Sequence, residues 1–66
     1  LLEYRDKLTH RTLALLPEPY REVLVLKFLE NMGYEEISDI LKIPEGTVAT
    51  RINRAKKAFR KIMNHP

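Results

Sequence analysis

Polar and cationic side chains recur in the last third of the sequence at spacings that suit contacts with nucleic acid. Thr50 can meet a base edge or a thymine methyl group, Asn53 can pair with adenine, and Arg54 can bond guanine through O6 and N7. From residue 49 onward no acidic residue occurs, and the basic residues are Arg51, Arg54, Lys56, Lys57, Arg60 and Lys61. Charge of one sign confined to one segment favours a polyanionic partner, although the net charge of the chain is only +3.

A helix that begins near Glu45 would place these side chains on one flank. At about 100° per residue the apolar residues fall together on the opposite side, at Val48, Ile52, Ala55, Phe59 and Ile62. The outer flank is then small and polar near its beginning and cationic towards its end. A helix that enters the major groove needs slim side chains at the base edges and longer donors beyond them. We therefore expect base contacts from Thr50, Asn53 and Arg54.

Phosphate contacts are expected from residues around the same flank. Thr47, in the first turn, can donate to a phosphate near the positive end of the helix dipole. Arg51 lies at the edge of the apolar side, and two roles stay open for it: a phosphate contact, or an ion pair with Glu36 or another acid of the preceding helix. The remaining candidates are Lys56, Lys57, Arg60 and Lys61, which would supply affinity without reading sequence.

Four helices, divided by proline and glycine, would position these residues. The first is expected at about Leu2–Leu16, the third at Tyr34–Leu41 and the fourth at Glu45–Met63. The second is expected to hold Pro17 and Pro19 in its first turn and to end at Asn31-Met32-Gly33. The second helix is apolar on most sides and is expected to be the most buried, with Gly33 ending it in the left-handed conformation. Four aromatic residues on apolar stripes are expected in the core, namely Tyr20, Phe28, Tyr34 and Phe59.

The third and fourth helices are separated by only three residues, Lys42-Ile43-Pro44. The buried stripe of the third helix is expected to consist of Tyr34, Ile37, Ile40 and Leu41. Two helices joined by so short a turn cross steeply and form a helix-turn-helix unit, here at about residues 34–57. The sequence thus predicts one all-α domain over residues 1–66, a four-helix arrangement that is winged-helix-like but has no wing.

Composition argues against several other classes of protein. The chain has no cysteine for a disulfide or a thiolate metal site. Glu35, Glu36 and Asp39 lie close together on one short helix without a partner base, so they form no catalytic pair. No apolar run approaches the length of a membrane span. We expect a non-enzymatic protein without cofactor, metal or membrane contact, and interpret the chain, which begins with Leu, as a piece of a longer cytoplasmic protein.

The segment from Leu16 to Ile62 resembles region four of bacterial RNA polymerase sigma factors, especially the extracytoplasmic-function group. The pattern of that family contains L-P-x-x-x-R, G-x-s-x-x-E-I-A and G-T-V-x-S-R-[LI]-x-R-A-[RK]. The matching residues here are Leu16-Pro17, Arg21, Gly33, Glu36-Ile37, Gly46-Thr47-Val48, Arg51-Ile52 and Arg54-Ala55-Lys56.

The resemblance implies binding of the −35 promoter element in the bacterial cytoplasm, at the nucleoid, and docking on the flap of the polymerase β subunit. It implies that Ala49 faces the DNA bases together with Thr50, Asn53 and Arg54. Lys42 replaces the glycine often found in the turn and is expected to add a phosphate contact. Ala49 stands where many relatives carry a basic residue, so the promoter sequence is not transferable from them. Ser38 in place of alanine and Thr50 in place of serine are milder departures.

Two alternatives remain open at this point. The output domain of a response regulator shares the four-helix plan and would bind a palindromic site as a dimer, although the G-T-V and R-A residues favour a sigma factor. A purely protein-binding module would use the apolar second helix and the acidic residues at 35, 36 and 39 to dock a polymerase subunit or an inhibitory anti-sigma factor. That role is compatible with DNA binding.

Overall fold

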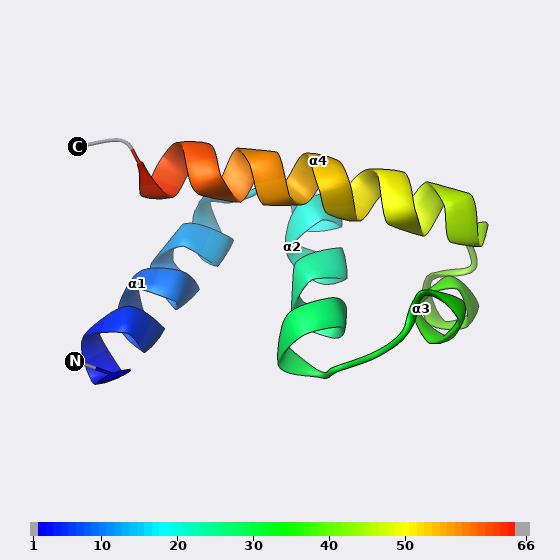
Figure 1. Ribbon diagram of the computed structural model, residues 1–66, viewed down its shortest axis with the longest axis horizontal. Helices are drawn as coiled ribbons and strands as arrows, with labels where there is room; N and C mark the ends of the chain where they lie inside the picture. Colours follow the sequence, from blue (N-terminus) through cyan, green and yellow to red (C-terminus); the bar gives the residue numbers. More distant parts are fainter. Residues whose placement is uncertain (1, 65–66) are drawn as a thin grey trace.

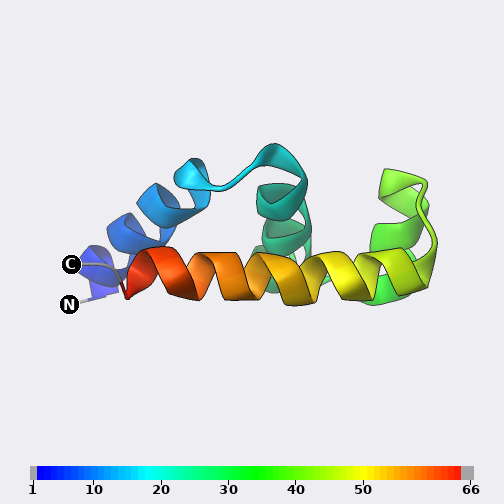
Figure 2. The same cartoon turned by 90° about the horizontal axis from the view of Figure 1, so that it is seen from above.

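The computed structural model describes residues 2–64, and the side chains of residues 7–64. Its elements are α1 (Leu2–Leu15), α2 (Glu18–Leu24), a π-helical segment η1 (Val25–Leu29) that continues α2, α3 (Tyr34–Leu41) and α4 (Glu45–Met63). The long helix α4 runs along one side of the molecule, and α1, α2 and α3 lie side by side against it (Figures 1 and 2). The predicted all-α, four-helix class is confirmed, and the described residues contain no strand that could form a wing.

The core lies where α4 packs against α2, α3 and α1. Its buried apolar residues are Leu13, Leu16, Val23, Leu24, Ile37, Val48, Ile52 and Ala55. The apolar side predicted for α4 is confirmed, because Val48, Ile52 and Ala55 are fully buried and Phe59 and Ile62 pack against them in partly buried positions. Fully burying a side chain such as Val48 or Ile52 stabilises the fold by about 1.5–3 kcal/mol, so the inward side of α4 fixes which side faces outward.

The corner between α1 and α2 gives the L-P-x-x-x-R residues a structural role. Pro17 caps α2, and its carbonyl accepts hydrogen bonds from the backbone N–H groups of Tyr20 and Arg21, each at 3.0 Å. The Arg21 guanidinium reaches back and donates to the carbonyl of Leu16 at 3.3 Å. Arg21 therefore fastens the end of α1 to the start of α2.

The second predicted helix changes its hydrogen-bonding pattern halfway along. In η1 the N–H of Glu30 bonds the carbonyl of Val25, five residues back, at 3.0 Å. Each turn of a π-helix holds more residues than a turn of an α-helix, so the apolar stripe of α2 does not continue through η1. Phe28 and Leu29 are consequently about half exposed, at 50% and 49%. The second helix, predicted to be the most buried element, has its buried residues, Val23 and Leu24, in α2, and η1 has none.

The buried stripe predicted for α3 is also too wide. Only Ile37 is fully buried and Leu41 partly so, whereas Tyr34 and Ile40 are 43% and 51% exposed. This short helix meets α4 and η1 along a narrow line, which one fully buried side chain is enough to fill. The prediction of a core position is therefore wrong for Phe28, Tyr34 and Ile40.

The left-handed conformation predicted for Gly33 is found elsewhere in the connection between η1 and α3. Asn31, not Gly33, takes the left-handed conformation, with φ 56°, and Gly33 is extended with φ −81° and ψ 168°. Asparagine is one of the few residues with a side chain that visit the left-handed region readily. Gly33 instead caps α3, and its N–H donates to the Glu36 carboxylate at 3.3 Å. Counted back from Glu36-Ile37, the glycine of the family pattern falls on Asn31, and its small polar residue falls on Gly33.

The turn between α3 and α4 is closed by Ser38. Its backbone carbonyl accepts from the N–H groups of Lys42 and Ile43, and its hydroxyl donates to the carbonyl of Ile43. Lys42 lies in the left-handed region, with φ 60° and ψ 44°. A lysine there carries a steric penalty that glycine avoids, which explains the glycine that relatives often have in this turn.

Replacing Lys42 by glycine is expected to stabilise the fold by about 0.5–1 kcal/mol. The relief of left-handed strain, about 1–2 kcal/mol, exceeds the extra flexibility that glycine gives the unfolded chain, about 0.5–1 kcal/mol. Urea unfolding followed by circular dichroism measures the difference. Lys42→Ala is the control, because it removes the same charge and keeps the strain, so it should bring no gain. A less stable Lys42→Gly variant would contradict the strain.

Candidate nucleic-acid interface

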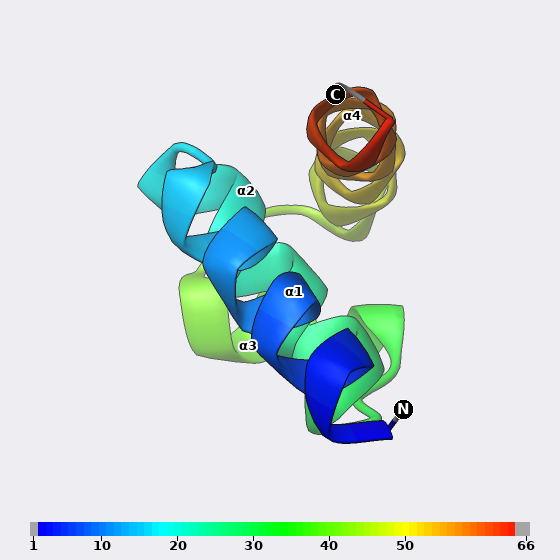
Figure 3. The ribbon, with the colours of Figure 1, turned by 90° about the vertical axis from the view of Figure 1, so that its left-hand side faces the viewer.

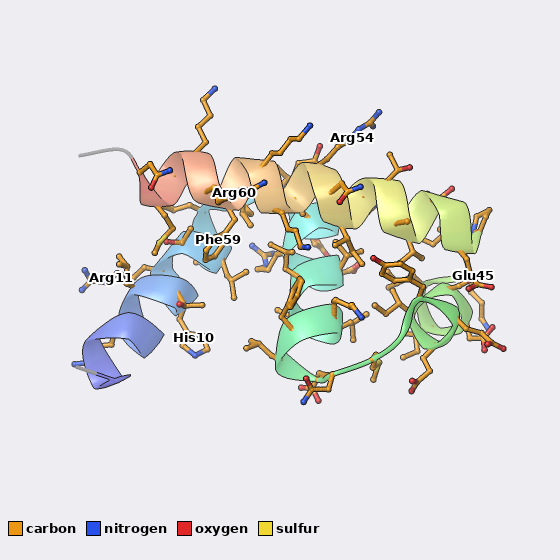
Figure 4. All side chains as sticks on the ribbon, in the orientation of Figure 1. His10, Arg11, Glu45, Arg54, Phe59 and Arg60 are labelled. Carbon is orange, nitrogen blue, oxygen red and sulfur yellow. The ribbon has the colours of Figure 1, made fainter. Side chains whose placement is uncertain are left out.

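The outer flank of α4 is an open surface on the described part of the molecule. Its exposed residues are Thr50, Asn53, Arg54, Lys57, Arg60 and Lys61, and Ala49 is half-buried at its edge. In an end-on view of α4, the other three helices all lie to one side of it (Figure 3). Arg54 points away from them, whereas Phe59 lies on the side of α4 that faces α1 (Figure 4). The residues predicted to meet bases therefore share a surface that the packing of this domain leaves uncovered.

The dimensions of this flank suit a duplex. A helix of 19 residues is about 28 Å long, and the major groove of B-DNA, about 12 Å wide, admits one helix. The slim residues Ala49 and Thr50 come first along α4, followed by Asn53 and Arg54, and the lysines come later. A helix that enters the groove by its first half would hold its second half near the phosphates.

The predicted phosphate contacts are distributed over two ends of the flank. Lys42 and Thr47 are exposed at the turn and in the first turn of α4, and Lys57 and Lys61 are exposed towards its end. Arg51 is half-buried beside the core. The Glu36 carboxylate accepts from the Gly33 N–H through one oxygen and is exposed, so both roles proposed for Arg51 stay open.

Lys56 and Arg60 border a second surface. The Lys56 ammonium lies 5.2 Å from the centre of the Phe28 ring, within range of a cation–π interaction. Both cations line a groove between α1, α2, η1 and α4, with a volume of about 460 Å³. The other lining residues are Thr9, Leu13, Leu24, Phe28, Leu29 and Phe59. The groove thus has an apolar floor and two cations on one wall.

This groove could be predicted from the sequence only indirectly. The sequence indicated an apolar second helix that could dock a protein, but it placed Phe28 and Phe59 in the core. The signal that could have revealed the groove is the number of apolar residues after Leu24, which exceeds what one buried stripe can hold. The acidic residues of α3, Glu35, Glu36 and Asp39, are exposed, and none of them lines the groove. Among the described helices, none has the length and apolar character needed to span a membrane.

Comparison with known proteins identifies the family to which this chain belongs. Residues 7–59 match the family model described as Sigma-70, region 4. The chain is 52% identical to the ECF RNA polymerase sigma factor SigW of Bacillus subtilis over 46 residues. These residues are 70% of this chain and 25% of that protein. Identity is 41% over 54 residues with the RNA polymerase sigma-H factor of Pseudomonas aeruginosa, covering 82% of this chain and 28% of the relative.

A third relative, the ECF RNA polymerase sigma-E factor of Escherichia coli, is 41% identical over 59 residues, which are 89% of this chain and 31% of that protein. The chain thus spans between a quarter and a third of the length of these relatives. The match extends from residue 7 in α1 to residue 59 in α4, and it includes the residues of both surfaces except Arg60 and Lys61. The chain belongs to the region 4 family of sigma-70 factors.

Proposed function

We propose that this chain is the promoter-binding domain of a sigma factor, which recognises the −35 element and directs RNA polymerase to start transcription there. Residues 1–66 would form one such domain, with the helix-turn-helix at about residues 34–57. The observation that carries the proposal is the uncovered flank of α4, slim at its beginning and cationic towards its end, in a member of the sigma region 4 family. In this proposal the domain acts by binding alone, without a chemical step, at the nucleoid in the cytoplasm.

In the proposed complex α4 enters the major groove with its outer flank. Arg54 bonds guanine with two donors, Asn53 pairs with adenine, and Thr50 meets a base edge or a thymine methyl group. Ala49, which carries only a methyl group, leaves room for a base pair to approach. Phosphates on the two sides of the groove are held by Lys42, Thr47 and Arg51 near the turn, and by Lys56, Lys57, Arg60 and Lys61 further along.

Binding to a duplex selected from a randomised pool is expected to weaken steeply with salt. Each phosphate that the protein neutralises adds about −0.9 to the slope of log K against log salt concentration. Fluorescence anisotropy of a labelled duplex at several salt concentrations measures this slope. Lys57→Gln should reduce its magnitude by about 0.9, whereas Lys7→Gln, an exposed lysine on α1, should leave it unchanged. A flat salt response would rule out the proposed complex.

The response-regulator alternative makes a different prediction about stoichiometry. An output domain of that class would bind a palindromic duplex as a dimer, whereas the proposed function needs one copy on one element. Light scattering with and without DNA separates the two. The family match favours the single copy.

We propose further that the groove between α1, α2, η1 and α4 docks the β-subunit flap of RNA polymerase. Its floor offers Leu13, Leu24 and Phe59 to an apolar side chain, and Phe28 stands half exposed at its edge. Lys56 and Arg60 on one wall favour a partner segment with acidic residues beside its apolar anchor. An anti-sigma factor would inhibit by occupying the same groove.

A further inference from the structure

Gly46, in the first turn of α4, serves no purpose that the fold of this chain reveals. Its backbone has no positive φ, so no conformation there requires glycine. Apart from its chain neighbours and the nearby backbone of α4, a Cβ atom placed on it would meet no atom within 4 Å, so no packing requires glycine either. Glycine also destabilises a helix relative to alanine. The empty space beside Gly46 thus has a cost in stability and no benefit within the described domain.

The position of Gly46 indicates what that space is for. At about 100° per residue, Gly46 lies on one stripe with Thr50, Asn53 and Lys57, at steps of four, three and four residues. This stripe is directly opposite the buried residues of α4. A side chain at position 46 would therefore project straight into whatever the outer flank binds. Glycine is a typical residue where a backbone approaches a ligand closely.

We propose that Gly46 is the point at which the backbone of α4 lies closest to the DNA. This inference rests on the proposed DNA-binding function. Without a Cβ at this position, the first turn of α4 sinks far enough into the groove to bring Thr50 and Asn53 within hydrogen-bonding distance of the base edges. Even one added methyl group would hold the start of the helix away, and hydrogen bonds weaken steeply once the donor and acceptor are separated beyond their normal range.

The test compares variants of the two glycines of the chain on the selected duplex. Gly46→Ala is expected to bind about tenfold more weakly, a loss similar to that of one base contact, and Gly46→Leu should bind more weakly still. The salt slope should not change, because no charge is lost, and the melting temperature of Gly46→Ala should not fall. Gly33→Ala, at the N-cap of α3, is the control and should bind like the unsubstituted chain.

The outcomes separate this inference from the function on which it rests. If the unsubstituted chain binds no duplex, the proposed function fails first. If that chain binds and Gly46→Ala binds equally tightly, only the role of Gly46 is overturned. A loss of affinity accompanied by a lower melting temperature would assign the effect to folding and would also overturn it. Weaker binding by a variant at least as stable as the original supports the close approach.

Discussion

Replacing Arg54 by alanine is expected to weaken binding to the selected duplex by about 1–3 kcal/mol, which is roughly 5- to 150-fold. The Arg54 side chain is exposed and points away from the other helices (Figure 4), so the change removes two donors to guanine without opening a cavity. The melting temperature should therefore remain close to that of the unsubstituted chain. Anisotropy titrations and a thermal melt followed by circular dichroism measure the two quantities.

Two further variants make the Arg54 prediction specific. Arg11→Ala removes an arginine that is also exposed, from α1, and should leave DNA binding unchanged (Figure 4). Arg54→Lys keeps the positive charge and loses the planar pair of donors, so it should retain the salt slope but discriminate less well against replacement of the guanine. If Arg54→Ala binds as tightly as the original chain, α4 does not enter the groove in the proposed orientation.

The inward side of α4 could be predicted from the sequence because a long amphipathic helix shows its burial pattern directly. Val48, Ile52 and Ala55 follow one another at steps of four and three residues, and the structure buries all three. Once that side was fixed, the placement of Thr50, Asn53 and Arg54 on the exposed flank followed from the helix geometry. Their contacts with bases stay predictions, which the Arg54 variants and the selected duplex test.

Features that depend on competing hydrogen bonds could not be predicted in this way. The periodicity of residues 18–29 is compatible with α-helical or π-helical bonding, and the π form of η1 decides that Phe28 faces out of the core. Asn31 and Gly33 can both adopt positive φ, and the bond from the Gly33 N–H to Glu36 accompanies the extended form of Gly33. In both places the sequence is compatible with two local structures, and it does not indicate which of the competing hydrogen bonds forms.

Hydropathy also does not distinguish an aromatic residue of the core from one kept for a partner. Phe28 and Tyr34 are each about half exposed, and each ring lies under a lysine, with Lys56 5.2 Å and Lys27 5.0 Å from the ring centres. The cation shields part of an apolar surface that would otherwise face water. Of these two rings, only Phe28 lines the groove. The pair therefore offers a matched test of polymerase docking.

Replacing Phe28 by alanine is expected to weaken binding of the isolated β-subunit flap by about 30-fold or more, the effect of losing an aromatic anchor worth about 2 kcal/mol. The ring is half exposed and not part of the buried cluster, so the fold and the affinity for DNA should persist. Titration calorimetry with the purified flap measures the first effect, and duplex anisotropy the second.

Tyr34→Ala is the control for the Phe28 variant, because it removes another half-exposed ring that lies under a lysine but outside the groove. If the groove is the docking site, the flap should distinguish the two variants, binding Tyr34→Ala normally and Phe28→Ala weakly. Equal affinity for both would place the flap elsewhere on the domain. Arg54→Ala should bind the flap normally, since its side chain lies on the other surface of α4. Loss of DNA binding in Arg54→Ala and of flap binding in Phe28→Ala would show that the outer flank of α4 and the groove serve two different partners.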